Sequence, residues 1–199
     1  TRKQAEAPRR YSRLLDAAYG QLKRQNPRNL VVGGNTFTTG DIRPVRWIQN
    51  MKLPNGRPPR MDLFGHNPFS YRGPDLEKAP PGQEIVDFSE LGRFSKKVDQ
   101  YLARPRDKRH LRLYLSEWTI PTDAPDLEFN FYVTRPLQAR WIRDGFKVAR
   151  ELNAYALGWI HLYDGVPRAD GGPIIRGGLM TADGQKKPGY FAFKRAKGS

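Results

Sequence analysis

The fold is indicated most clearly by one stretch of sequence, LRLYLSEW at residues 111–118. Its first part is mainly apolar, which is typical of a strand in a parallel sheet that is covered on both faces. The polar residues Ser116 and Glu117 then end the run. In α/β proteins functional side chains gather at the carboxyl ends of parallel strands. Glu117 is therefore the first candidate for a functional residue.

Three further apolar runs have the same character, so that four strands are predicted in all. They lie near residues 30–35, 61–66, 111–117 and 155–161. Polar or aromatic side chains stand at or just after the ends of the other three runs: Asn35, His66, Asn67, Trp159, His161 and Tyr163. If the strands are parallel, all these residues lie at one edge of the sheet.

The segments between the runs have helical spacing. Apolar residues from Tyr11 to Leu22 fall on one helical face, and Asn26-Pro27 ends that helix. A short helix is expected within residues 41–50. Ser89 is a candidate cap for a helix whose apolar face runs from Leu91 to Leu102. A long helix capped by Thr134 and a last helix near residues 187–193 complete the pattern.

One helix followed by four strand–helix units predicts an α/β protein with a parallel sheet and right-handed crossovers. The chain has 199 residues, which suits a single domain over residues 1–199. The chain is short for a complete (β/α)8 barrel, which needs about 250 residues.

With no cysteine, the chain has no disulfide framework, thiol nucleophile or thiolate metal site. No apolar run approaches the length of about 20 residues that crosses a bilayer, so no membrane partner is expected.

The net charge of +15 allows two interpretations. A strongly basic chain is typical of a partner with many negative charges, such as nucleic acid. However, the basic residues are spread along the whole chain with acids between them, and no nucleic-acid-binding motif is present. We favour an arginine-rich surface over a nucleic-acid interface.

The residues expected at the sheet edge suit a sugar site. Aromatic faces pack on the C–H surfaces of sugars, and amides and carboxylates bond to their hydroxyls. Glu117 supplies a carboxylate, His66 an imidazole, and Asn35 and Asn67 two amides. From its local sequence alone, Glu117 is equally consistent with an ordinary ion pair to a loop arginine.

The order of four motifs resembles the carboxyl-terminal half of clan A glycoside hydrolases, the (β/α)8-barrel group that includes cellulases, xylanases, mannanases and β-xylosidases. The stretch LYLSEW (113–118) is similar to their seventh strand, and DLFGHNPF (62–69) to their sixth. LGW (157–159) is similar to the eighth strand, and GLMTADGQKKPGY (178–190) to the segment leading into the last helix. The resemblance covers nearly the whole chain.

This resemblance implies a fold and a reaction. The chain would supply about strands 5–8 of a TIM barrel, and Glu117 would be the nucleophile of a retaining β-glycosidase acting on plant-type polysaccharide or oligosaccharide. The acid/base Glu of that group ends the fourth strand in an Asn-Glu-Pro stretch, which does not occur here. The acid/base residue is therefore expected in a missing amino-terminal half. Among the loop acids Asp164 is the best placed substitute, although a role in sugar binding or turn capping is more ordinary.

The resemblance also implies roles for residues around Glu117. His66 would orient the carboxylate, and Trp159 would form the floor of the sugar subsite. The full set of expected substrate-binding residues is His66, Asn35, Asn67, Tyr71, Trp118, Trp159 and Tyr163. Neither a metal nor a cofactor is expected, and the resemblance favours a secreted protein.

Two alternatives to an enzyme remain open, which are a non-catalytic carbohydrate-binding or scaffold half-barrel and a basic nucleic-acid-binding domain. The isolated chain is expected to be inactive. Half a barrel would leave two strand edges unpaired, so we expect the chain to pair with the missing half or with a second copy.

Overall fold

In the computed structural model, residues 2–82, 84–103, 110–126 and 129–196 are described. Four strands form one parallel sheet in the order β1-β2-β3-β4: β1 (Val32–Phe37), β2 (Leu63–Asn67), β3 (Leu113–Leu115) and β4 (Ala156–Leu157). The predicted parallel α/β architecture is confirmed. Because all four strands run the same way, their carboxyl ends meet at one edge of the sheet.

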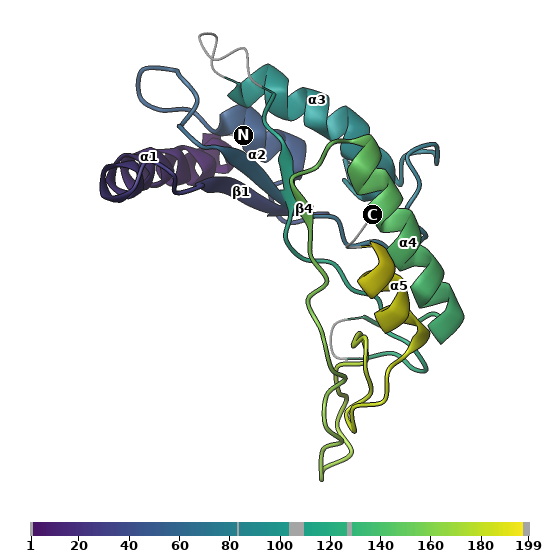
Figure 1. The fold of residues 1–199 in the computed structure, drawn as a ribbon. Helices are drawn as coiled ribbons and strands as arrows, with labels where there is room; N and C mark the ends of the chain where they lie inside the picture. Colours follow the sequence, from purple (N-terminus) through teal and green to yellow (C-terminus); the bar gives the residue numbers. More distant parts are fainter. Residues whose placement is uncertain (1, 83, 104–109, 127–128, 197–199) are drawn as a thin grey trace.

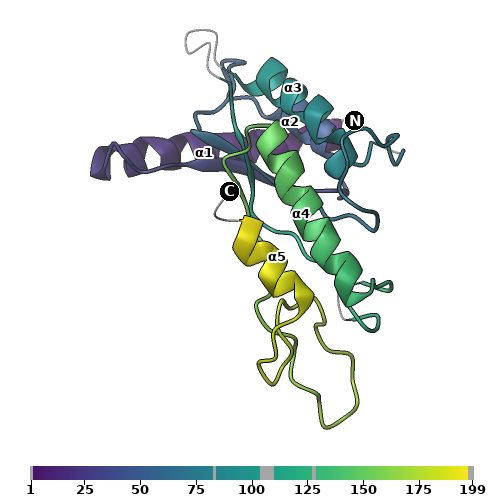
Figure 2. The same ribbon diagram turned by 45° about the vertical axis from the view of Figure 1, so that its right-hand side comes forward.

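Helices connect the strands. They are α1 (Arg2–Gln25), α2 (Pro44–Asn50), α3 (Leu91–Leu102), which follows a short 3-10 turn η1 (Phe88–Glu90), α4 (Arg135–Glu151) and α5 (Pro188–Ala196). Figures 1 and 2 show α3, α4 and α5 on the same side of the sheet, with α5 alongside α4. The long segment between β4 and α5 extends away from the sheet (Figure 1). None of the helices in the described ranges is long and apolar enough to cross a membrane.

The main core lies between the sheet and the helices. It joins Leu15 of α1, Ile48 of α2, Phe94 of α3 and Trp141 of α4 to one face of the strands, where Phe64 is completely buried. Adjacent residues of a strand point to opposite faces, and Val32 on the other face of β1 is exposed. One face of the sheet is therefore covered by helices, whereas the other is partly open.

The two glycines of β1, Gly33 and Gly34, allow this close packing. A Cβ atom on Gly33 would lie 2.7 Å from a methyl carbon of Leu15. Gly34 has a φ of +86°, and a Cβ there would lie 2.5 Å from the ring of Phe64. A larger residue at either position would push α1 or β2 away from β1.

The local signals located the helices well and the strand ends less well. Thr134 caps α4 as predicted, because its hydroxyl accepts a hydrogen bond from the Leu137 N–H at 3.3 Å. The cap before α3 is different: Asp87, not Ser89, accepts the bond, from the Ser89 N–H. The third and fourth strands are also shorter than predicted and contain only residues 113–115 and 156–157.

Candidate active site

Three polar side chains from three neighbouring strands meet at the carboxyl edge of the sheet. The Ser116 hydroxyl, just after β3, lies 2.8 Å from Oδ1 of Asn35 in β1 and 2.7 Å from Oδ1 of Asn67 at the end of β2. The strand register brings them together, since β1 pairs with β2 and β2 with β3. The predicted proximity of Asn35 and Asn67 is therefore observed, and Ser116 is the residue that links them.

The backbone at Asn35 is held in an uncommon conformation. Its φ is +56°, and the register between β1 and β2 shifts across this residue. Asparagine tolerates the left-handed region better than most residues. The neighbouring Gly65 leaves room for it, because a Cβ there would lie 2.9 Å from the Asn35 nitrogen. This bulge turns the Asn35 side chain toward Ser116.

Glu117 follows Ser116 directly. Its side chain is half-buried, and it makes no hydrogen bond or ion pair with any residue in the described part of the chain. The ordinary alternative, an ion pair with a loop arginine, is thus not found among those residues. Among the described residues other acids, such as Asp41 and Asp144, also lack a cationic partner. The Glu117 carboxylate differs in its place at the end of β3, where it stays available to a ligand.

His66 is placed differently from the prediction. The side chain is completely buried and packs 4.8 Å from the ring of Phe94. Both ring nitrogens are engaged, Nε2 with the Val86 carbonyl at 2.9 Å and Nδ1 with the Thr36 hydroxyl at 2.9 Å. A carbonyl only accepts, so Nε2 carries the proton and Nδ1 accepts from Thr36. The expected contact of His66 with Glu117 or substrate is corrected: this histidine joins β1, β2 and the loop before α3.

Burial lowers the pKa of His66 to about 4, against the opposing effect of its two hydrogen bonds. The unfolded chain takes up this proton near pH 6.5, so stability is lost as the pH falls from 6.5 toward 4. Lowering the pH from 7 to 5 should cost about 2 kcal/mol through this residue. Urea unfolding at both pH values measures it. In His66→Gln the difference should shrink by about that amount, and an unchanged difference would contradict the assignment.

The two tryptophans expected to bind substrate, Trp118 and Trp159, lie mainly in the core. Trp118 is buried and packs against Phe88 at 4.7 Å and Trp159 at 5.1 Å between ring centroids. A Cβ on Gly145 of α4 would lie 2.5 Å from the Trp118 ring, so this indole fills the space between sheet and helix. The expected substrate contact of Trp118 is therefore corrected.

Trp159 is partly buried and packs against the residues of the main core. Its ring N–H donates to the Gly177 carbonyl at 2.9 Å, so this polar atom is already used within the protein. Only part of the indole surface is left for a ligand. In contrast, Tyr71 and Tyr163 are both exposed, and Tyr71 packs edge-on against Phe131.

Asp164 has a structural partner. Its carboxylate forms an ion pair at 2.7 Å with Lys187, whose side chain is completely buried. Lys187 also donates to the Thr122 hydroxyl at 2.9 Å and the Arg176 carbonyl at 3.2 Å. The lysine thus holds together the loops after β3 and β4 at the start of α5. Asp164 is engaged in this contact and is a poor candidate for the missing acid/base residue.

An aromatic cavity, which the sequence did not predict, lies at the same edge of the sheet. Its volume is about 150 Å³. The lining residues come from the segments after β1, β2 and β3: Phe37, Thr38, Thr39, Phe69, Ser70, Tyr71, Ile85, Asp87, Phe129 and Phe131. Nothing in the local sequence indicates that Phe129 and Phe131, in the loop after β3, meet the rings of the other two segments.

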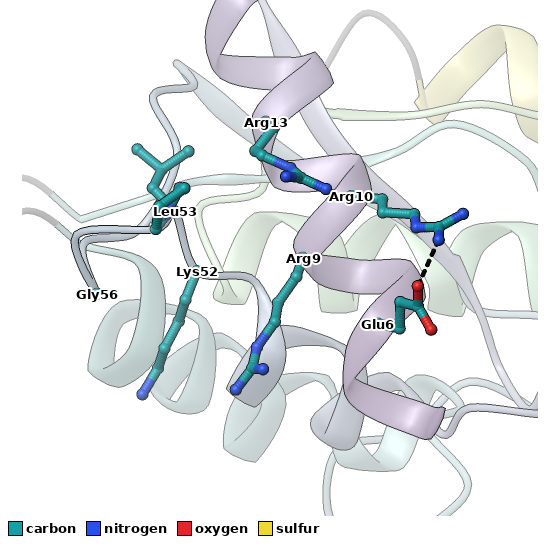
Figure 3. Close-up of a pocket in the computed structure, with 8 residues that line it drawn as sticks. Glu6, Arg9, Arg10, Arg13, Lys52, Leu53 and Gly56 are labelled. Atoms are coloured by element: carbon teal, nitrogen blue, oxygen red, sulfur yellow. Dashed lines mark hydrogen bonds and ion pairs between the residues drawn. The ribbon is translucent and has the colours of Figure 1, made fainter. Parts of the chain in front are cut away.

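A second concavity lies between the first half of α1 and the loop after α2 (Figure 3). This basic groove has a volume of about 650 Å³ and is lined by Glu6, Arg9, Arg10, Arg13, Lys52, Leu53, Pro54 and Gly56. Arg10 pairs with Glu6, and Figure 3 shows Arg9 and Lys52 pointing the same way. Arg9, Arg13 and Lys52 have no acidic partner in the described ranges.

Within the described residues, no three side chains of His, Asp or Glu gather as they would to hold a metal ion. The candidate site consists of Glu117 and the hydrogen-bonded group of Asn35, Asn67 and Ser116.

The fold is shared with glycoside hydrolases. No family model and no curated protein matches the sequence. Solved structures do match: a family 39 glycoside hydrolase from the gut symbiont Bacteroides cellulosilyticus has a TM-score of 0.62 at 18% identity, over 94% of this chain and 36% of its own. A monomeric β-xylosidase from Caulobacter crescentus has a TM-score of 0.59 at 20% identity, over 94% of this chain and 37% of its own. A family 39 enzyme from Xanthomonas axonopodis pv. citri has a TM-score of 0.57 at 18% identity, over 94% and 36%.

At a sequence identity of 18–20%, the similarity to these structures shows a shared fold. The chain spans little more than a third of the length of these structures. It therefore has the α/β fold of the TIM-barrel glycoside hydrolases over the part of their length that it covers.

Proposed function

We propose that this chain is the carboxyl-terminal half of a retaining β-glycoside hydrolase barrel, with Glu117 as the nucleophile. The observation that carries the proposal is that Glu117, whose carboxylate has no partner among the described residues, directly follows Ser116, which bonds to Asn35 and Asn67. It stands at the carboxyl edge of a parallel sheet, where barrel enzymes have their active sites. The similarity to β-xylosidases supports a substrate of the plant-polysaccharide or oligosaccharide class.

In the proposed reaction, a Glu117 carboxylate oxygen attacks the anomeric carbon as the bond to the leaving oxygen breaks. A second carboxyl group, about 5–5.5 Å away, gives its proton to the leaving oxygen and then takes one from the water that cleaves the intermediate. Asn35 and Asn67 are placed to bond to sugar hydroxyls. Tyr163 follows β4 and Tyr71 follows β2, and both have exposed rings on which a sugar can pack.

We assign β1 to β4 to strands 5–8 of the barrel. Within the described residues, β1 and β4 each have a neighbouring strand on one side only. An amino-terminal half would pair with both edges and cover the open face of the sheet, where Val32 is exposed. The acid/base residue would come from that half, and a second copy of this chain is the other partner that suits the two free edges.

The test is hydrolysis of an aryl β-xyloside by this chain joined to the amino-terminal half of a family 39 barrel, with and without Glu117→Gln. Loss of hydrolysis with retained binding supports the nucleophile. Binding without hydrolysis by the unmutated protein would instead favour the carbohydrate-binding alternative.

The basic groove favours a second candidate function, which is the binding of nucleic acid through its phosphates. Arg9, Arg13 and Lys52 supply three positive charges, but the groove has no aromatic ring on which a base stacks. Affinity for duplex DNA should then fall steeply with salt.

Replacing these three residues together by Gln should reduce the slope of log affinity against log salt by about 2.7, since each phosphate contact contributes about 0.9. The matched control replaces Arg28, Arg143 and Lys147, which are exposed elsewhere. Titrations of labelled duplex DNA at several salt concentrations measure both slopes. Equal slopes for the two triple variants would exclude the groove as the binding site.

A further inference from the structure

The aromatic cavity is formed by rings from parts of the chain that are far apart in sequence. Phe37 lies 5.3 Å from Phe69, and Phe69 lies 5.7 Å from Phe129, measured between ring centroids. The Phe129 ring lies 5.5 Å from that of Phe131, and the Phe131 ring lies 6.0 Å from that of Tyr71. These five rings form a continuous wall. The exposure of Phe37 and Tyr71 shows that the wall is open to solvent.

Three of the polar side chains that line the cavity are already bonded to the protein, whereas the hydroxyls of Thr39 and Tyr71 make no hydrogen bond with a described residue. The Thr38 hydroxyl lies 3.0 Å from the Asn67 carbonyl and 2.7 Å from the Phe69 carbonyl. The Ser70 hydroxyl donates to the Arg72 carbonyl at 2.9 Å. Asp87 pairs with Arg72 at 2.7 Å and also accepts from Ser89. Little hydrogen-bonding capacity among these three residues therefore remains for a ligand.

The pKa of the Asp87 carboxyl is consistent with these bonds. Burial alone would raise the pKa of its carboxyl, but the hydrogen bonds from Arg72 and Ser89 outweigh burial, and the pKa lies below the ordinary value. The carboxylate is thus ionised and held by its partners. A group committed in this way does not exchange its bonds for those of a sugar hydroxyl without loss.

A sugar ring has hydroxyls around its edge, and each one that enters an apolar cavity without a partner carries a desolvation cost. An aromatic ring has no such cost. The volume of about 150 Å³ also resembles that of a dry apolar protein cavity known to bind benzene. The cavity therefore suits a single aromatic ring better than a sugar.

We infer that the aromatic cavity binds an aromatic aglycone, so that the substrates are aryl glycosides. This inference rests on the proposed function, because it assigns the leaving group of that reaction. The cavity and the nucleophile are linked: the Thr38 hydroxyl bonds to the Asn67 carbonyl, and the Asn67 side chain bonds to Ser116, next to Glu117.

The test uses the 199-residue chain with two probes, 4-methylphenol for the aglycone and methyl β-xyloside for the sugar. Amide NMR titration should show 4-methylphenol shifting the resonances of the cavity residues, and methyl β-xyloside leaving them in place. Phe37→Ala should weaken 4-methylphenol binding by about threefold to tenfold, as expected for the loss of one ring contact.

The matched control is Phe191→Ala on α5, because Phe191 is 44% exposed and Phe37 is 45% exposed. A second variant, Thr39→Trp, fills the cavity and should abolish 4-methylphenol binding without removing any ring of the wall. If both cavity variants bind like the control, or if methyl β-xyloside shifts the same resonances, the inference is overturned.

Failure of the proposed function would look different. Glu117→Gln should leave 4-methylphenol binding unchanged, since the carboxylate does not line the cavity. A protein that binds 4-methylphenol at the cavity but shows no Glu117-dependent hydrolysis after joining to the amino-terminal half would lose the enzymatic role and keep the aromatic site.

Discussion

Replacing Glu117 by Gln in the joined protein is expected to lower kcat for an aryl β-xyloside at least about a thousandfold, as the loss of a covalent nucleophile does. The neutral amide neither attacks the anomeric carbon nor stabilises its positive charge. Because Gln has nearly the same shape and still forms hydrogen bonds, the dissociation constant for substrate should change by no more than about threefold.

Glu151→Gln on α4 is the matched control, since Glu151 is an exposed carboxylate away from the sheet edge. Azide gives a further readout in Glu117→Ala. It should attack the anomeric carbon from the face that the carboxylate leaves empty, forming a C–N bond as the aryl alcohol departs, and yield the α-glycosyl azide. A Glu117→Gln variant with more than a tenth of the original kcat would show that the nucleophile is another residue.

Replacing Lys187 by Met is expected to destabilise the protein by about 3–5 kcal/mol, the usual cost of removing one partner of a buried ion pair. The Lys187 side chain has no exposed surface, and that of Asp164 is 13% exposed. Burial lowers the pKa of Lys187, although the hydrogen bond and charge of Asp164 act in the opposite direction. Without the lysine, Asp164 keeps the Gly178 N–H, at 2.9 Å, but no cation.

Urea unfolding followed by circular dichroism measures the change. Lys147→Met serves as the control, because Lys147 is 72% exposed in its pair with Glu151, and it should change the stability by less than about 0.5 kcal/mol. The double variant Lys187→Met/Asp164→Asn should be more stable than Lys187→Met alone, since no buried charge is left unpaired. A Lys187→Met protein within about 1 kcal/mol of the original would show that the pair contributes little.

The helices were predictable because their signals are local. Apolar spacing between Leu91 and Leu102 located α3, and Thr134 marked the start of α4. Asp87 was missed as a cap because a 3-10 turn precedes α3, and Ser89 lies inside that turn.

Strand lengths depend on the partner strand, and the sequence of one strand does not contain that information. Leu111 and Ser116 belong to the predicted strand at residues 111–117, but β2 and β4 pair only with residues 113–115. β4 is short for the same reason. The contact between Asn35 and Ser116 also depends on a bulge in β1, which no residue pattern indicated.

The candidate site was only partly predictable for a related reason. Glu117, Asn35 and Asn67 became candidates because they stand at the ends of apolar runs. His66 satisfies the same rule, but Thr36 and Val86 hold it in the core from positions 30 and 20 residues away. Lys187 lies 65 residues from Thr122. Such distant partners decide whether a polar residue is structural or functional, and spacing along the chain does not reveal them.

A serine hydroxyl has a single proton, yet that of Ser116 faces two amide oxygens at nearly equal distances, 2.8 Å from Asn35 and 2.7 Å from Asn67. At any instant one of these oxygens lacks the serine's proton. A third donor would settle the competition, and an incoming alcohol group can serve as that donor. The amide oxygen without the serine's proton can thus accept a hydrogen bond from a ligand that carries O–H groups.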